Sequence, residues 1–294
     1  MRIVLTGASG SLGAYLVESL LRRGHEVIAW SGSGVGERFG VPLVPLNLED
    51  EEAIADRLDL DDPAAVLHAA AMSAAESVRR DPERGNRINV LATQRIADWC
   101  ARRNRRMVYT STDLVFDGSR SWYREDDPAE PILAYGRTKR DAEPAVVAVP
   151  GGLVARLSLL FGPSHSGRDA FFDRAIAALS LGEPQSFFDD EFRTPLDLST
   201  AANVLVRLTE MQVAGIVHVA GSERMSRHEL MSRAASALGL DGALVRANQR
   251  HQVASSEPRP ADASLDTTRL LDWLPDLERP TVERALTDST FGNV

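Results

Sequence analysis

The chain has 294 residues, of which 44% are hydrophobic and 26% are charged. This composition supplies enough apolar material for one large core or two unequal domains, and it excludes a disordered chain or a coiled-coil rod. The formal net charge of -9 argues against a protein whose main task is to neutralise nucleic-acid phosphates. We therefore expect a small-molecule partner and no nucleic acid.

Cysteine usage and apolar runs indicate the compartment. Cys100 is the only cysteine, so it cannot form an intrachain disulfide, and no cluster of cysteine and histidine suggests a metal site. The apolar residues before Gly7 are too few for a signal peptide, and no run of 18 apolar residues follows. We expect a cytoplasmic protein that does not cross a membrane.

Short apolar runs alternate with helical patterns through the first half, which is typical of strand–helix units in a parallel sheet. The predicted strands are Arg2–Thr6, His25–Trp30, Leu43–Leu46, Ala64–Ala71, Met107–Ser111 and Leu153–Phe161. The predicted helices are Leu12–Leu21, Glu51–Leu58, Asn86–Arg103 and Tyr135–Ala142. The polar stretch Asp117–Pro131 is expected to be a loop.

Beyond Gly162-Pro163 helical patterns dominate. They cover Ala170–Leu181, Leu198–Glu210, Arg227–Leu238, Thr267–Trp273 and Thr281–Leu286. We predict an α/β fold in which residues 1–163 form a Rossmann-type, doubly wound parallel sheet that binds a dinucleotide. Residues 164–294 are expected to form a smaller, mostly helical part that binds substrate, with Leu198–Ala220 returning to the first sheet as a helix and a strand.

A glycine turn follows the first predicted strand. Gly7 permits a tight turn, Gly10 lets the backbone approach phosphate, and Gly13 lets the first helix pack against the strand. The N-H groups of this turn and of the helix N-terminus are suited to a pyrophosphate. The predicted cofactor contacts here are Gly7, Ser9, Gly10, Ser11, Leu12 and Gly13.

The end of the second strand indicates which dinucleotide binds. A site that prefers NAD normally offers a carboxylate here to the ribose 2'-hydroxyl, whereas this chain has Ser31 and Ser33. Both serines can donate to a 2'-phosphate, and Arg38 lies in the following segment. We expect NADP, with NAD as the alternative; the competing interpretation is that Ser31–Gly36 is only a flexible loop.

The catalytic pattern is Ser111-Thr112-Asp113 at the end of the fifth strand, followed by Tyr135-Gly136-Arg137-Thr138-Lys139. In this order the sequence resembles the extended short-chain dehydrogenases/reductases, and within them the dTDP-4-dehydrorhamnose reductase group. The resemblance covers nearly the whole chain, including the glycine turn, Asn89, Phe161-Gly162-Pro163, Phe192-Arg193-Thr194-Pro195 and Arg259-Pro260. It also implies that Asn47, Leu48, Ala69, Ala70 and Ala71 border the cofactor.

The chemistry of ketone reduction explains these residue types. The oxygen of a ketone that accepts hydride must receive a proton, and Tyr135 is the expected donor. Lys139 lies one helical turn later, where its ammonium is expected to lower the tyrosine pKa toward neutrality and to hold the nicotinamide ribose. Thr112 can donate a second hydrogen bond to the same oxygen. The alternatives are a backbone-capping hydroxyl for Thr112 and a half-buried aromatic residue for Tyr135.

Lys139 stands out in another way, because every other residue among the 33 lysines and arginines is an arginine. Arginine and lysine are interchangeable as solvated surface charges, but not where a compact ammonium must enter a site. The alternative is chance, because so skewed a composition leaves its one lysine anywhere. Its place after Tyr135 favours a functional role.

The resemblance implies a reductase of a keto group, with a 4-keto nucleotide sugar as the expected substrate. Rhamnose-pathway reductases usually have an aromatic residue after the Thr-Asp pair and a tryptophan late in the sixth strand, whereas these positions look like Leu114 and Leu159 or Leu160 here. Another nucleotide-linked keto-sugar, or a ketone carried on a less polar group, is therefore an alternative.

Leu114 stands where related dehydratases carry a glutamate, so dehydration is disfavoured. Asp113 and Phe161 are weaker candidates for substrate contacts. Arg193 and Arg259 are candidates for a diphosphate, and the alternative is that each is a surface salt-bridge residue. The alternatives are a non-catalytic NADP-binding regulatory subunit, or an epimerase, for which no second acid–base pair is evident. A homodimer is compatible with each of them.

Overall fold

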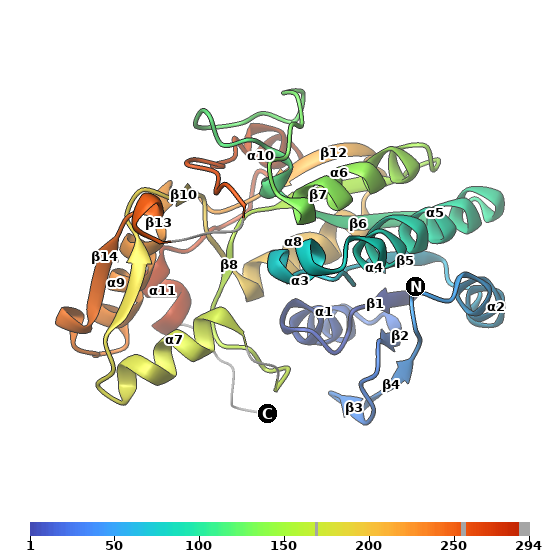
Figure 1. The fold of residues 1–294 in the computed structure, drawn as a ribbon. Coiled ribbons are helices and arrows are strands. Elements are labelled where there is room, and N and C mark those ends of the chain that lie inside the picture. The colour runs from blue at the N-terminus through green and yellow to red at the C-terminus, as the bar shows by residue number, and fades with distance from the viewer. Residues whose placement is uncertain (168–169, 254–256, 288–294) are drawn as a thin grey trace.

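The computed structural model describes residues 1–167, 170–253 and 257–287 (Figure 1). Its centre is an eight-stranded sheet with the order β12-β7-β6-β5-β1-β2-β4-β3, parallel except for the pair of β3 with β4. The strands are β1 (Arg2–Thr6), β2 (Glu26–Ser31), β3 (Glu37–Arg38), β4 (Val41–Pro45), β5 (Ala65–His68), β6 (Arg106–Thr112), β7 (Leu153–Leu157) and β12 (Gly215–Val219).

Helices cover both faces of this sheet. One layer holds α1 (Ser11–Arg22), α8 (Leu198–Glu210) and α10 (Thr268–Trp273), and the other holds α2 (Glu51–Asp61), α5 (Ala92–Arg103) and α6 (Ala134–Val147). Alternate residues of a strand point to opposite faces, so Ile3 and Leu5 pack in the first layer and Val4 packs in the second. The predicted doubly wound parallel sheet is confirmed.

The segment predicted as one helix, Asn86–Arg103, has a different local structure. It follows α3 (Ala75–Arg80) and is built from α4 (Pro82–Asn86), a π-helical turn η1 (Arg87–Leu91), and α5. Within the turn, the Asn89 side chain accepts from the Met72 N-H at 2.8 Å and donates to Thr138 Oγ1 at 2.9 Å. The π turn therefore directs the Asn89 side chain toward Met72, which follows β5, and toward Thr138 on α6. Helical periodicity alone does not predict these contacts.

Two predicted strands are too long. The fourth ends at His68, so residues 69–71 leave the sheet, and the sixth divides into β7 and β8 (Leu160–Phe161). At the other edge of the sheet β12 pairs in parallel with β7, from Gly215 opposite Leu153 to Val219 opposite Leu157. Residues 198–219 thus supply a helix and a strand to the first sheet.

The remaining C-terminal residues form a smaller layer beside the sheet, yellow to red in Figure 1. Its helices are α7 (Phe171–Ser180), α9 (Arg227–Ala237) and α11 (Val282–Thr287), and their apolar faces share a core that includes Phe172, Leu230 and Met231. Short strands pair between them, which the expectation of a mostly helical part understated: β9 (Gln185–Phe188) with β14 (Val245–Asn248), β10 (Phe192–Arg193) with β13 (Met225–Ser226), and β8 with β11 (Leu196–Asp197). Among the described residues, no helix is both long and apolar enough to span a membrane.

Candidate active site

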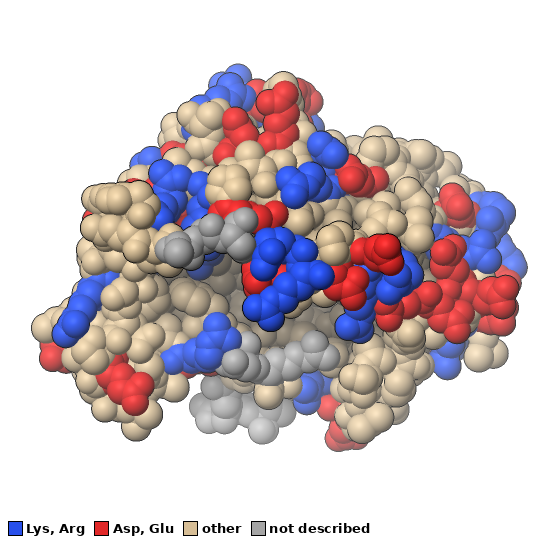
Figure 2. All heavy atoms as spheres, viewed as in Figure 1, with Lys and Arg blue, Asp and Glu red and all other residues tan. Residues whose placement is uncertain are grey.

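A cleft of about 900 Å³ lies beyond the carboxyl ends of the parallel strands. It is visible as the hollow between the two parts of the molecule in Figure 2, where arginines line its edge. Most of the residues predicted to bind the cofactor or to react line it, namely Gly7, Ser9, Gly10, Ser11, Leu12, Gly13, Ser31, Ser33, Asn47, Leu48, Ala69, Ala70, Ala71, Thr112, Tyr135 and Lys139.

The glycine turn leaves no room for side chains. Gly7 has a φ of +76°, and a Cβ on it would lie 2.8 Å from the Ala70 nitrogen. A Cβ on Gly13 would lie 2.1 Å from the Gly7 carbonyl oxygen, so α1 packs directly against the turn. Gly10 is the N-cap of α1 and offers no side-chain oxygen to the first N-H groups of the helix. This cradle of backbone donors fits a pyrophosphate.

Lys139 lies in the floor of the cleft. It is only 1% exposed, and its Nζ lies 4.1 Å from the centroid of the Tyr109 ring on β6. Burial lowers the pKa of Lys139 to about 7, and the Glu143 carboxylate one turn further along α6 acts in the opposite direction. The Lys139 side chain can therefore be a charged ammonium or a neutral amine near neutral pH.

Tyr135 and Thr112 border the same cleft. Burial, with a smaller contribution from the Asp113 carboxylate, raises the pKa of Tyr135 above its ordinary value of 10.0. The expected lowering toward neutrality is thus wrong in direction, because sequence spacing supplies the neighbouring lysine but not the loss of water. Thr112 Oγ1 accepts from the Leu114 N-H at 3.2 Å, so the alternative capping role is also present.

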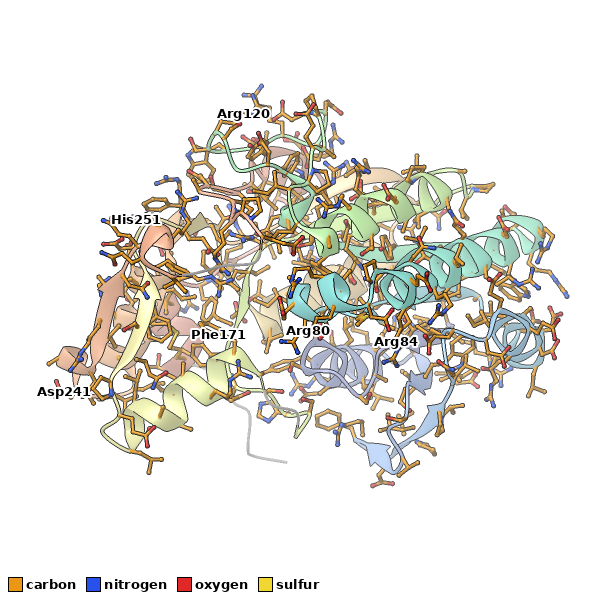
Figure 3. All side chains as sticks on the ribbon, viewed as in Figure 1. Arg80, Arg84, Arg120, Phe171, Asp241 and His251 are labelled. Carbon is orange, nitrogen blue, oxygen red and sulfur yellow. The ribbon has the colours of Figure 1, made fainter. Side chains whose placement is uncertain are left out.

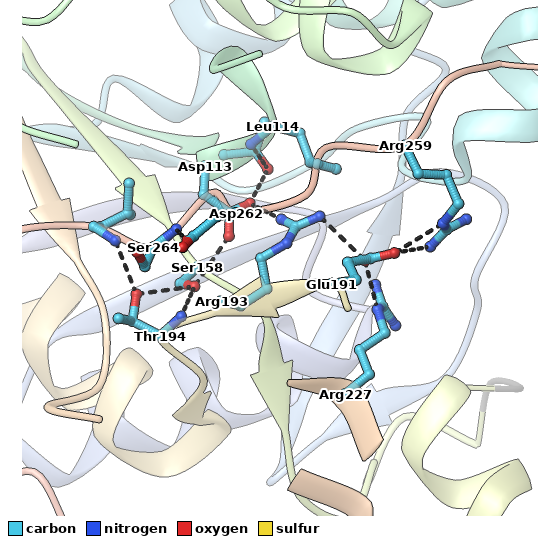
Figure 4. Close-up of polar contacts among 12 residues, drawn as sticks. Asp113, Leu114, Ser158, Glu191, Arg193, Thr194, Arg227, Arg259, Asp262 and Ser264 are labelled. Atoms are coloured by element: carbon cyan, nitrogen blue, oxygen red, sulfur yellow. Dashed lines mark hydrogen bonds and ion pairs between the residues drawn. The ribbon is translucent and has the colours of Figure 1, made fainter. Parts of the chain in front are cut away.

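A buried cluster of acids and arginines lies next to Thr112 (Figure 4). Asp113 is 2% exposed and contacts Arg193 Nη1 at 2.7 Å and Ser158 Oγ at 3.0 Å. Arg193 also reaches Glu191, which is fully buried and binds Arg227 at 2.8 Å and Arg259 at 2.7 Å. Arg193 and Arg259 are both paired with acids, but the expected surface position is wrong for Arg193, which is 3% exposed because its partners lie in the interior.

Three other predicted residues lie away from the cleft. Asp113 is directed into the ion-pair cluster, and Phe161 lines a second, smaller cavity of about 240 Å³ beside Tyr15 and the start of α8. Arg38 donates to the carbonyl of Ser166 at 2.6 Å and is not among the residues that line the cleft. Each position depends on a tertiary contact that the local sequence does not specify.

Sequence reasoning missed one wall of the cleft. Ser73, Ser77, Arg84 and Ile88 line it from the segment that leads into α5. Figure 3 shows Arg80 and Arg84 between α3, α4 and the first helix. Ser158 was also missed, although its position just after β7, at the edge where the other strand ends meet, was an available signal. The helical wall carries no comparable motif.

The Glu191 cluster gives a testable prediction for stability. Burial alone would raise the pKa of Glu191, but Arg227, Arg193 and Arg259 outweigh it and lower the pKa from 4.5 to about 2. The ionised carboxylate therefore stabilises the fold fully above pH 4.5, and this contribution is lost as the pH falls toward 2. At neutral pH, Glu191→Gln should cost about 3–5 kcal/mol in free energy of unfolding, because it leaves buried guanidiniums unbalanced.

Urea unfolding at pH 7 and pH 4 measures this effect. The difference in free energy of unfolding between the wild type and the Glu191→Gln variant should be smaller at pH 4 than at pH 7. Glu183→Gln, on the exposed turn after α7, is the matched control and should unfold like the wild type. Equal stability of wild type and Glu191→Gln at pH 7 would show that the cluster does not stabilise the fold.

Comparisons with known proteins agree with this geometry. The family model described as RmlD substrate binding domain matches residues 1–289. The probable low-salt glycan biosynthesis reductase Agl14 of Haloferax volcanii is 29% identical over 289 residues, covering 96% of this chain and 95% of the relative. Methionine adenosyltransferase 2 subunit beta of Xenopus laevis is 30% identical over 280 residues, covering 92% of this chain and 81% of the relative.

A solved structure shares the fold over nearly the whole chain. The dTDP-4-dehydrorhamnose reductase of Bacillus anthracis, in complex with NADP, superposes with a TM-score of 0.85 at 21% identity and covers 98% of this chain and 97% of its own. The resemblance to this reductase group that the sequence suggested is confirmed by the family match. The chain belongs to the family described by the RmlD substrate binding domain.

Proposed function

We propose that this protein is an NADP-dependent reductase of a keto group, with a 4-keto nucleotide sugar as the substrate class. The observation that carries the proposal is the shared cleft, which Tyr135 and Lys139 of α6 and Thr112 at the end of β6 line together with the glycine cradle. In this scheme residues 1–163 hold the cofactor, and the C-terminal part supplies the substrate side. The single cysteine, buried with a pKa raised to about 12 by its burial, is consistent with a reducing, cytoplasmic compartment.

The residues of the chain divide the reaction between them. A bound reduced nicotinamide supplies the hydride. Tyr135 donates a proton from its hydroxyl to the substrate oxygen, and its raised pKa means that the hydroxyl is protonated at neutral pH when the oxygen becomes basic. Lys139, when protonated, stabilises the phenolate that remains, and Thr112 donates a hydrogen bond to the same substrate oxygen.

Cofactor choice follows from the end of β2. Ser31 is 2% exposed and donates to the carbonyl of Gly34, whereas Ser33 is exposed and lines the cleft. A 2'-phosphate thus meets a hydroxyl donor and no carboxylate from this strand end, so NADPH should bind at least about tenfold more tightly than NADH, or about 1.4 kcal/mol. NADP in the related Bacillus anthracis structure supports this choice.

Fluorescence titration with both cofactors at fixed salt measures the preference. Ser31→Asp should reverse it, because a carboxylate repels the 2'-phosphate and accepts from a free 2'-hydroxyl. Ser180→Asp, at the exposed end of α7, adds the same charge away from the cleft and should leave the preference unchanged. Tighter binding of NADH by the wild type would overturn the assignment.

A second candidate function has its own support. The Xenopus laevis relative at 30% identity is a subunit of methionine adenosyltransferase, so a non-catalytic regulatory subunit that binds NADP is the alternative. NADPH consumption with a panel of keto-sugar nucleotides separates the candidates. Stoichiometric oxidation supports the reductase. Product without net oxidation would indicate an epimerase, and binding of NADPH without any turnover would favour the regulatory subunit.

A further inference from the structure

A second buried ion pair lies directly behind Lys139. Glu143 follows Lys139 by four residues on α6, so both side chains occupy one face of the helix. The Glu143 carboxylate accepts from Arg156 Nε at 3.0 Å and Nη2 at 2.7 Å on β7, and from Ser111 Oγ at 2.6 Å on β6. Glu143 and Arg156 are 4% and 3% exposed. Three elements that border the cleft thus meet at one carboxylate.

Arg156 is fixed from its other side as well. Its Nη1 donates to the carbonyl of Glu125 at 3.3 Å, and its guanidinium lies 5.2 Å from the centroid of the Phe116 ring. A guanidinium that is held at both ends cannot swing away from Glu143. The position of the carboxylate relative to Lys139 is therefore set by the sheet as well as by α6.

The other groups around Lys139 do not balance its charge. Tyr109 and Tyr135 have pKa values that burial raises, so both are neutral at pH 7, and burial followed by the nearby ammonium lowers the pKa of His68 on β5 to about 3. Asp113 is paired with Arg193. Other charged residues nearby form pairs of their own in contact with solvent, namely Glu76 with Arg79 and Arg80, Arg140 with Asp141, and, at the wall of the cleft, Glu49 with Arg84 and Arg87.

We propose that Glu143, held in place by Arg156 and Ser111, is a positioning residue that keeps the ammonium of Lys139 charged in the floor of the cleft. Burial disfavours the charged form of an amine, and a nearby carboxylate restores it. Arg156 brings a competing positive charge to the same carboxylate, so it should act on Lys139 in the direction opposite to Glu143. The role of Lys139 in stabilising the Tyr135 phenolate rests on the proposed function, whereas the charge balance between Lys139, Glu143 and Arg156 does not.

The two partners must then affect Lys139 with opposite sign. Among Lys139, Glu143 and Arg156, Glu143 carries the negative charge. Glu143→Gln removes it and should make Lys139 lose its proton at lower pH. Arg156→Gln removes a competing positive charge and should make Lys139 lose its proton at higher pH. Damage to packing alone has no reason to move the two variants in opposite directions, so the pair separates a charge effect from a structural effect.

The lone lysine makes this directly measurable without a substrate. Protein labelled with ¹³C only in lysine gives one set of side-chain resonances, all from Lys139, and the ¹³Cε shift against pH reports its titration midpoint in the full chain. We expect the midpoint to fall by about one pH unit in Glu143→Gln and to rise by a similar amount in Arg156→Gln. Ser111→Ala keeps both charges and should produce a smaller shift than either variant.

The double variant protects the test against misfolding. If Arg156→Gln alone does not fold, Glu143→Gln combined with Arg156→Gln removes both members of the ion pair, so neither is left without its partner, and the Lys139 midpoint should lie above that of Glu143→Gln. Unchanged midpoints, or shifts of the same sign in both single variants, would overturn the proposal. The titration result does not depend on turnover. An active Tyr135→Phe variant would contradict the proposed reductase and leave the proposed charge balance around Lys139 unaffected. Unchanged Lys139 midpoints would contradict the charge balance and leave the reductase unaffected.

Discussion

Tyr135→Phe should lower the turnover of a ketone substrate by a factor of about 10²–10⁴, the usual contribution of a positioned proton donor. The substitution keeps the ring and removes only the hydroxyl. Because the loss concerns an interaction made in the transition state, it should appear in kcat at saturating NADPH, whereas the Kd for NADPH changes little. Steady-state kinetics combined with a cofactor titration measures both quantities.

Tyr15→Phe is the matched control. The Tyr15 hydroxyl donates to the carbonyl of Pro163, and the residue lines the smaller cavity, away from the cleft. Tyr15→Phe removes a hydroxyl, as Tyr135→Phe does, and loses one hydrogen bond. Its turnover of the ketone substrate should be close to that of the wild type. Near-normal turnover by Tyr135→Phe would remove the proposed proton donor and strengthen the regulatory alternative.

Lys139→Arg should also be strongly impaired, although it preserves a positive charge. The ammonium is almost completely enclosed and lies against the Tyr109 ring, so a larger planar guanidinium has no room to occupy the same position. One displaced transition-state contact commonly costs about 2.7–4 kcal/mol, or roughly a hundredfold to a thousandfold in rate. Overpacking should in addition lower stability by about 1–3 kcal/mol.

Kinetics and thermal melting together separate these two effects. Arg140→Lys makes the reverse exchange at the next residue of α6, where Arg140 pairs with Asp141 at the surface, and should leave both rate and melting temperature unchanged. A Lys139→Arg variant with the turnover of the wild type would show that any cation suffices at this position, contrary to the role proposed for it.

The parts of the fold that local patterns encode were predictable. Leu198–Glu210 was predicted with its observed bounds, because its apolar residues recur at helical spacing and Asp197 caps its first turn. Tyr135 and Lys139 line the same cleft, and their placement together was predictable from the Tyr135-Gly136-Arg137-Thr138-Lys139 motif, because a spacing of four residues on a helix gives a shared face. The two-residue strands β10 and β13 were missed, since so short a run carries no period and exists only because a distant segment pairs with it.

The partners of charged residues were not predictable for the same reason. Asp113 and Arg193 are 80 positions apart in the chain, and nothing near either residue specifies the other. The direction of the Tyr135 pKa depends on how much water the finished cleft excludes, which is a property of the whole fold. Glu143 had a usable signal in its spacing from Lys139 on α6, but its partner Arg156 lies on strand β7.

The π-helical turn at Arg87–Leu91 constrains how the length of this chain can change. A π turn holds one residue more than an α-helix needs, so deleting one residue between positions 87 and 91 would give a continuous α-helix from α4 into α5. Because the π turn absorbs its extra residue within a wider turn, the helix on either side would keep its register, and Ile96 and Ala97 would stay in the core. The effect would be local, since the Asn89 side chain would lose the position from which it contacts Met72 and Thr138. A deletion within these five positions should therefore remove that contact while the helix itself persists.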